Sequence, residues 1–277
     1  MTVSETDFAV SPERTAAAAR QRDPLTRKMM DVGPFLLSFA ALFTLWHVVS
    51  VYVVASVLFP PPAGVFIKGA ELVANGTLFE HAVASLSRIA TGFALGSMLG
   101  IPIGLIIGSF RLARKLIEPW TEFLRFIPAV AMITIAVIWF GIGEESKIFL
   151  IIYTTIFIVI LNTAAGVSSI APNKLRAARA LGANSWQVFF YVALPATVPF
   201  ILTGMRLAMA NSFTTIVAAE LISANAGLGV MLWNGRMFML IEEIFVSLVT
   251  LGLLGFCADR LFRIGIYRFA RRYAPVA

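Results

Sequence analysis

The chain has 277 residues, of which 59% are hydrophobic and only 13% are charged, and its mean hydropathy is +0.86. An ordinary soluble domain carries about a quarter charged residues, so this composition excludes a soluble fold. The net charge of +7 does not indicate a nucleic-acid partner, because the cations gather at the ends of apolar runs and no basic groove with interleaved aromatic residues is evident. We therefore expect an all-α integral membrane protein.

Six apolar runs are long enough to cross a hydrocarbon core, which takes about 20 residues. A polar segment of mixed charge, residues 1–33, precedes them and is interpreted as a cytoplasmic tail. The first run is too long for the core of a signal peptide, so we expect it to be retained. The spans are predicted at residues 34–59, 84–108, 119–140, 148–170, 192–222 and 242–266, and residues 267–277 form a second tail.

The positive charges between the spans predict the orientation. If the N-terminus is cytoplasmic, 16 of the 22 lysines and arginines lie in cytoplasmic segments and only three lie in outer loops. Loops rich in Lys and Arg stay in the cytoplasm, so both termini are expected inside. The outer loops suit either a soluble partner or plain connections, and composition does not decide between these.

The second span has a glycine at every fourth position. Residues four apart share one face of a helix, and small residues there let another backbone approach closely. We interpret this face as a ridge for helix packing, and Pro102 on the same helix predicts a local kink. The ridge residues are Gly92, Gly96, Gly100, Gly104 and Gly108.

The sequence lacks the common motifs of enzyme active sites. Neither His47 nor His81 belongs to an H-E-x-x-H motif, no glycine-flanked nucleophilic serine is present, and no P-loop occurs. Cys257 lies in an apolar run and is interpreted as a small buried hydrophobic residue. No catalytic residue and no metal site are expected, and the chain is not expected to be an enzyme.

The fifth span is unusually polar for a membrane helix. A cation at membrane depth is costly unless it faces a cavity or a partner, so we interpret its polar residues as a stripe along a translocation pathway. Alternatively, Arg206 is neutralised by a carboxylate such as Glu122 or by helix carbonyls, and the hydroxyls bond carbonyls of their own helix. The candidate pathway residues are Arg206, Asn211, Thr214, Thr215 and Glu220.

A basic segment between the fourth and fifth spans, residues 172–191, is called the elbow segment here. Its sequence predicts a short helix over residues 172–181 that stops at Gly182. Asn184 and Ser185 can cap a second helix that leads into the membrane. Such a helix–turn–helix, exposed in the cytoplasm, is suited to bind another protein.

The elbow segment resembles the signature of the inner-membrane permeases of binding-protein-dependent ABC importers. That signature is E-A-A, three residues, G, nine residues, and I-x-L-P. The resemblance implies a coupling helix that docks in a groove of a separate ATPase, and Arg176, which stands in place of the glutamate, is expected to make a different contact. The matching residues are Arg176, Ala177, Ala178, Gly182, Leu194 and Pro195.

The resemblance extends over nearly the whole chain after the tail and is nearest to the taurine, sulfonate and nitrate branch. Within that branch, WFGIGEESK, RAARALGA and TTIVAAELISANAGLG look most like taurine permeases. The resemblance implies a type I ABC importer permease fold in a bacterial inner membrane. It also implies a permease homodimer, two ATPase subunits that hold ATP and Mg, and a periplasmic substrate-binding protein, with no cofactor in this chain.

The function that the resemblance implies is passage of a small sulfonate such as taurine by alternating access. Nitrate or another small anion is the alternative substrate. An ion-coupled secondary transporter is a further alternative, which predicts inverted repeats and several buried acids. No clear repeat is evident, and Glu220 is interpreted as the only acid well inside the predicted spans.

Overall fold

The computed structural model describes residues 24–54, 56–221 and 224–269, and all regular structure assigned there is helical. Contacts divide the chain into two units, Met1–Ala63 and Gly64–Ala277. Five helical runs in the described part are long and apolar enough to cross a membrane, and a sixth is added if one bent helix pair counts as a span. The predicted all-α membrane fold is confirmed.

The first unit contains a long apolar helix. Helix α2 (Pro24–Val48) continues into a π-helical turn, η1 (Val49–Val54), so helix begins within the predicted polar tail. Residues 1–23 of that predicted tail lie outside the described residues. The Ser50 hydroxyl donates a hydrogen bond to the Phe59 carbonyl at 2.6 Å, which holds the proline-rich turn against the end of the helical run.

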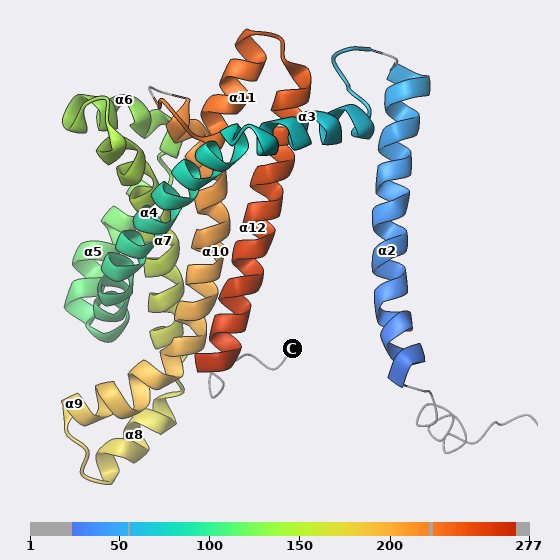
Figure 1. Cartoon of the computed structure of the whole chain (residues 1–277). Coiled ribbons are helices and arrows are strands. Elements are labelled where there is room, and N and C mark those ends of the chain that lie inside the picture. Colours follow the sequence, from blue (N-terminus) through green and yellow to red (C-terminus); the bar gives the residue numbers. More distant parts are fainter. Residues whose placement is uncertain (1–23, 55, 222–223, 270–277) are drawn as a thin grey trace, which may run out of the picture. The chain divides into compact units, whose positions relative to one another are not determined.

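The second unit is a bundle of four long helices with shorter ones at its ends (Figure 1). One core cluster takes a single buried residue from each of five helices, so the bundle closes around shared apolar side chains. The long helices are α4 (Thr77–Ser109), α7 (Glu144–Ser168), α10 (Leu194–Glu220) and α12 (Ile241–Phe269). The cluster residues are Ile89, Ile151, Ile216, Leu228 and Leu251.

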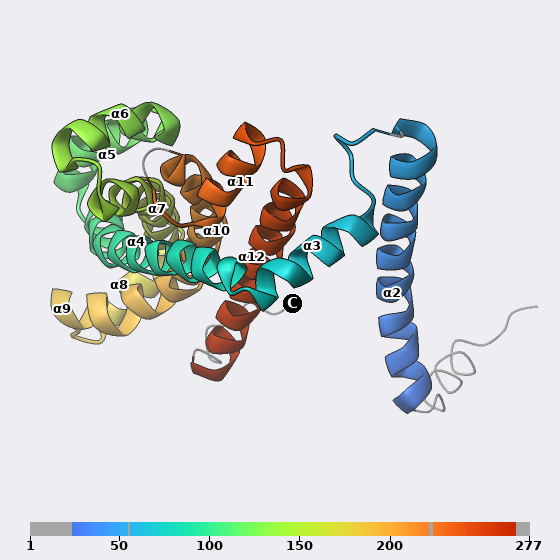
Figure 2. The ribbon, with the colours of Figure 1, turned by 45° about the horizontal axis from the view of Figure 1, so that its top comes forward.

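Helix α4 packs on α7 through its glycines, and Figure 2 shows α4 crossing over α7. A Cβ atom at Gly96 would lie 2.7 Å from the Thr155 Cβ, and one at Gly104 would lie 2.6 Å from the Thr163 Cβ. Real Cβ atoms do not approach so closely, so only glycine permits this backbone contact. The α7 residues that meet the five glycines are Ile151, Thr155, Val159, Thr163 and Val167.

The predicted third span is broken rather than continuous. Helices α5 (Arg111–Arg125) and α6 (Ala129–Phe140) meet at 101°. The break falls at Pro128, because the residue before a proline is disfavoured in the helical region. With 12 residues, α6 is too short to cross the core on its own.

Two predictions about α12 are wrong. Cys257 is exposed in this chain rather than buried. Asp259 lies within the apolar run Ile241–Ile266, so Glu220 is not the only acid inside the candidate spans. The exposure of Cys257 depends on how the other helices pack against α12, which the apolar run alone does not reveal.

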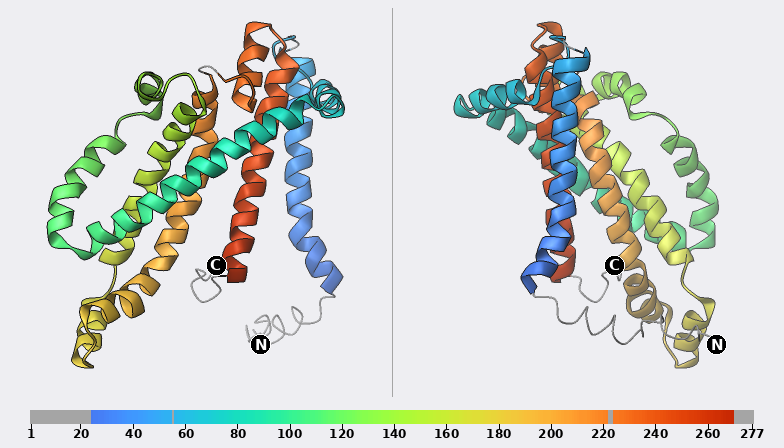
Figure 3. Two further views of the ribbon diagram at one scale, coloured as in Figure 1. Left: turned by 60° about the vertical axis from the view of Figure 1, so that its left-hand side comes forward. Right: turned by 90° about the vertical axis from the view of Figure 1, so that its right-hand side faces the viewer.

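The shorter helices gather at two ends of the bundle. Figures 1 and 3 place α8 (Pro172–Ala180) and α9 (Ser185–Val188) at one end, called here the elbow end. Helices α6 and α11 (Leu228–Met237) lie at the opposite end. Helix α3 (Pro62–Ala74) packs against the start of α12, where Lys68 forms an ion pair with Glu243 at 3.4 Å.

Candidate functional site

The elbow segment folds as two short helices that meet at a tight turn. Helix α8 ends at Ala180, and Gly182, two residues later, has a φ of 85° in the left-handed region. The Gly182 amide donates to the Arg179 carbonyl at 2.9 Å, and the Ala183 amide donates to the Ala178 carbonyl at 3.1 Å. These two bonds form a Schellman motif, which glycine at this position favours.

The second helix of the elbow segment starts at a capping box. The Gln187 amide donates to the Asn184 side chain at 2.9 Å, and the Asn184 amide donates to the Gln187 side chain at 2.8 Å. Helix α9 then widens into a π-helical turn, η2 (Phe189–Ala193), immediately before α10. Pro195 has no amide hydrogen to donate back into this turn, which is consistent with the widening. The elbow segment is therefore continuous with α10.

The elbow segment presents an uncovered apolar surface. No residue of α8 is buried, and the side chains of Leu181, Trp186 and Tyr191 are 89%, 72% and 80% exposed. The Trp186 and Phe190 rings stack at 5.7 Å. Exposed apolar surfaces of this kind are typical of sites that contact another protein or the membrane.

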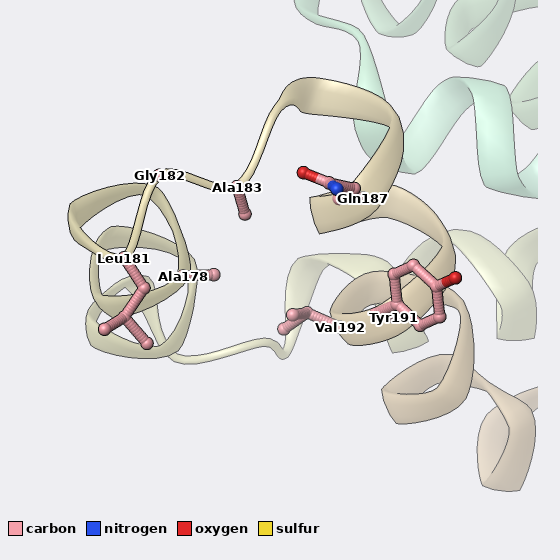
Figure 4. A pocket seen from close by; sticks show the side chains of 7 residues that line it. All are labelled: Ala178, Leu181, Gly182, Ala183, Gln187, Tyr191 and Val192. Carbon is pink, nitrogen blue, oxygen red and sulfur yellow. The ribbon is translucent and has the colours of Figure 1, made fainter.

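A hollow of about 410 Å³ opens between the two arms of the elbow segment (Figure 4). The first arm lines it with the end of α8 and the glycine turn, and the second arm lines it with residues of α9 and η2. Its lining residues are Ala178, Leu181, Gly182, Ala183, Gln187, Tyr191 and Val192. Ala178 and Gly182, which match the family signature, thus form part of its wall.

Arg176 is exposed on α8 and does not reach a carboxylate in the described residues. Its guanidinium donates to the Asn173 side chain at 2.5 Å, one turn earlier in the same helix. Lys174 and Arg179 are also exposed, so the outer face of α8 is cationic. A partner at this face meets positive charge where the family signature carries a glutamate.

Arg206 is neutralised within the bundle, by a different acid from the one suggested. Its guanidinium bonds both carboxylate oxygens of Asp259 on α12, at 2.5 and 3.2 Å. Glu122 instead pairs with Arg125 at 2.7 Å. The Arg206 side chain remains 43% exposed, so the pair joins α10 to α12 while part of it stays accessible.

The other candidate pathway residues of α10 do not form one site. The hydroxyls of Thr214 and Thr215 donate to the Asn211 carbonyl of their own helix at 2.7 and 3.0 Å, as the alternative interpretation expects. Thr215 is buried, whereas Thr214 is exposed. Glu220 lies 14 residues beyond Arg206, roughly 21 Å along the helix, and is fully buried.

Glu220 belongs to a buried ionic cluster near the end of the bundle opposite the elbow segment. Its carboxylate accepts hydrogen bonds from Ser85 at 2.8 Å, from Arg88 at 2.7 Å and from the Gly229 amide at 2.8 Å. These partners come from α4 and α11, so one carboxylate joins three helices. These contacts within the chain explain how the carboxylate is buried, and the role of Glu220 in a pathway remains a prediction.

Arg88 extends this cluster to α7. Its guanidinium forms a second ion pair with Glu144 and donates to the Ala226 carbonyl at 2.6 Å. Lys147 completes the group with a 3.0 Å bond to Glu144. The sequence signals were the charges of Arg88 and Glu220 inside predicted spans, but nothing in the sequence indicates that the two residues meet.

Comparisons with known proteins agree with the resemblance of the elbow segment. A family model described as "Binding-protein-dependent transport system inner membrane component" matches residues 100–274. A probable ABC transporter permease protein of Brucella melitensis is 40% identical over 237 residues, which cover 86% of this chain and 96% of that protein. The taurine transport system permease protein TauC of Escherichia coli is 36% identical over 262 residues, 92% of each protein.

The nitrate import permease protein NrtB of Synechocystis is 35% identical over 177 residues, 64% of each protein. Among solved structures, the inward-facing MetNI methionine ABC transporter superposes with a TM-score of 0.58 at 18% identity, covering 70% of this chain and 95% of that chain. At this identity the likeness shows a shared fold.

Proposed function

Since the chain belongs to the family of binding-protein-dependent transport system inner membrane components, we propose that it is the permease subunit of an ATP-driven importer of a small sulfonate such as taurine. The observation that carries the proposal is the elbow segment, an exposed apolar helix–turn–helix joined directly to α10. A sulfonate is favoured because the taurine permease matches 92% of this chain.

In this proposal the elbow segment transmits the motion of a separate ATPase. ATP and Mg bind that ATPase, since this sequence has no P-loop. Closure of the ATPase pair moves the elbow segment as a unit, because its turn is held by the Schellman motif and its second helix by the capping box. The displacement reaches α10 and then α7 and α12, which contact α10 at Gly204 and Arg206.

The functional complex in this proposal contains two copies of the permease, two ATPase subunits and a periplasmic binding protein in a bacterial inner membrane. The binding protein supplies most of the substrate selectivity. The permease alternates between an inward-open and an outward-open state and needs only weak contacts with its cargo. Nitrate is the second candidate substrate, because a nitrate permease is among the relatives.

Reconstitution tests the proposal. The permease is placed in vesicles with its ATPase and binding protein, and uptake of labelled taurine is measured in competition with an alkanesulfonate and with nitrate. We expect ATP-dependent taurine uptake that excess unlabelled taurine suppresses. Uptake that persists without ATP would overturn the mechanism, and uptake of nitrate alone would overturn the sulfonate assignment.

A further inference from the structure

Helix α5 has three faces with different chemistry. One face packs inward, one is apolar and uncovered, and one carries charges, as expected from side chains spaced 100° apart around a helix. The inward face includes Ile117, Thr121 and Leu124. The uncovered apolar face comprises Leu112, Leu116, Trp120 and Phe123, each more than 60% exposed. The charged face carries Glu118, Glu122 and Arg125 in the C-terminal half of the helix.

Hydrogen bonds fix the depth of α5 in the bundle. At its start, Arg114 donates to the Gly108 carbonyl at 3.1 Å and to the Ser168 hydroxyl at 2.8 Å, where α4 and α7 end. At its other end, the Tyr153 hydroxyl donates to the Leu124 carbonyl at 2.5 Å. Tyr153 is nine residues from the start of the 25-residue helix α7, roughly 14 Å along its axis. Leu124 therefore lies near the middle of a membrane span.

Glu122 and Arg125 are thus charged side chains at mid-membrane depth. They pair at 2.7 Å, yet their side chains remain 44% and 35% exposed in this chain. Charges at this depth face water or protein rather than lipid. The uncovered apolar face of α5 suits lipid, and the charged face points away from it.

The break after α5 supports a wet environment at this point. The chain turns by 101° between Arg125 and Ala129, directly beside the ion pair. Non-helical backbone at membrane depth is tolerated where it is buried in protein or lines a water-filled cavity. Secondary transporters also place their substrate sites at discontinuous helices near the midplane.

We propose that Glu122 and Arg125 line the translocation path at mid-membrane and contact a zwitterionic substrate. The inference rests on the proposed transport function and assigns to it a substrate-contacting pair. The Arg125 guanidinium has five donors to offer a sulfonate, and the Glu122 carboxylate accepts from an ammonium group. A lone cation favours any small anion, whereas two opposite charges one helical turn apart favour a molecule that carries both, such as an aminosulfonate.

Arg206 is less suited to this role. Asp259 binds its guanidinium through two hydrogen bonds, and Arg263 contacts the same carboxylate at 3.1 Å. The Arg125 guanidinium makes one bond to Glu122, at 2.7 Å, and packs over the Phe126 ring at 4.7 Å. Since the Arg125 guanidinium has further donors to offer, we infer that the cargo meets a cation at α5 rather than at Arg206.

Substrate competition in the reconstituted transporter tests the charge assignment. Arg125→Gln removes a charge-assisted hydrogen bond and should lower uptake of both taurine and an alkanesulfonate about tenfold. Arg125→Lys keeps the positive charge and should retain part of the uptake. Glu122→Gln should lower uptake of taurine alone by about the same factor, because the alkanesulfonate has no ammonium group. Glu71→Gln, which removes an exposed acid from α3, is the matched control.

Unchanged uptake and unchanged substrate preference in Glu122→Gln and Arg125→Gln would overturn the inference. This result is distinct from failure of the proposed function, in which the wild-type complex carries neither taurine nor the alkanesulfonate. Because a charge change can also impair assembly, copurification of the ATPase with each variant is measured alongside uptake.

Cysteine labelling tests the exposure to water independently of uptake. In a Cys257→Ala background, Glu122→Cys and Arg125→Cys should react with a charged, membrane-impermeant thiol reagent in the assembled complex. Leu116→Cys and Phe123→Cys on the apolar face should not react. No reaction at positions 122 and 125, with and without ATP, would show that protein covers the charged face and would overturn the inference.

Discussion

At the scale of single residues, Arg88 shows how a charge is held inside an apolar bundle. Its side chain is 7% exposed, and it bonds two carboxylates and a backbone carbonyl. Moving a charge out of water is costly, and the attraction to a partner offsets this only when the hydrogen bonds are well made. Loss of one member therefore leaves the remaining charge buried without its partner.

We predict that Arg88→Ala destabilises the protein by about 3–5 kcal/mol, because Glu220 then stays buried without its cation. Unfolding of the purified permease in detergent measures the effect. The control is Lys115→Ala at an exposed position of α5, where a change of about 0.5 kcal/mol or less is expected. If Arg88→Ala and the wild type have the same free energy of unfolding, the cluster contributes little to stability.

At the scale of elements, α4 and α7 depend on the glycine ridge, whereas the elbow segment depends on its glycine turn. The two roles differ physically. Gly104 is needed because a Cβ would meet Thr163 and the Ile160 carbonyl, at 2.6 and 2.7 Å. Gly182 has open space around it and is needed because its φ of 85° disfavours other residues.

Gly104→Leu should destabilise the bundle by about 1–3 kcal/mol, since the added side chain has to separate α4 from α7. The measurement is again unfolding in detergent. Gly252→Leu in α12 is the matched control, because nothing lies within 4 Å of a Cβ at that position. Equal stability of the two variants would contradict a ridge that needs glycine.

Gly182→Val should uncouple ATP hydrolysis from uptake, because a β-branched residue in the left-handed region costs about 1–2 kcal/mol and opens the turn of the elbow segment. The measurement is the number of substrate molecules carried per ATP hydrolysed. Gly182→Asn should be better tolerated, as Asn adopts this conformation more readily. A valine variant with the wild-type ratio would show that the turn does not transmit motion.

At the scale of the whole molecule, the bundle separates two kinds of polar structure. Arg88, Lys147 and Glu220, near the end opposite the elbow segment, are buried, and their ion pairs tie helices together. The cations of the elbow segment are exposed and accompany an uncovered aromatic surface. This difference suits a protein that is stabilised by ion pairs at one end and binds a partner through the elbow segment at the other.

Replacing Leu181 and Trp186 together with alanine should release the ATPase while leaving the stability of the isolated permease within about 0.5 kcal/mol, because both side chains are exposed. Copurification of the ATPase with the tagged permease measures this. Trp139→Ala on α6 is a control at another exposed tryptophan. Full retention of the ATPase by the double variant would contradict docking at this surface.

The membrane class, most of the long apolar helices and the helix–turn–helix of the elbow segment could be predicted because their causes are local. An apolar run of about 20 residues needs no knowledge of its neighbours, and Gly182 and Asn184 act on residues within a few positions. Motif spacing extended this to the family. The division into tails and a six-span domain remains a prediction.

Contacts between distant residues could not be predicted, because they form only when the helices pack. The sequence shows that Arg88 and Glu220 are charges in apolar surroundings, yet they are 132 residues apart and meet only when α4 and α10 pack together. The pairing of Arg206 with Asp259, which are 53 residues apart, was hidden for the same reason. Local sequence determines which segments enter the membrane, whereas packing determines which of their charges meet.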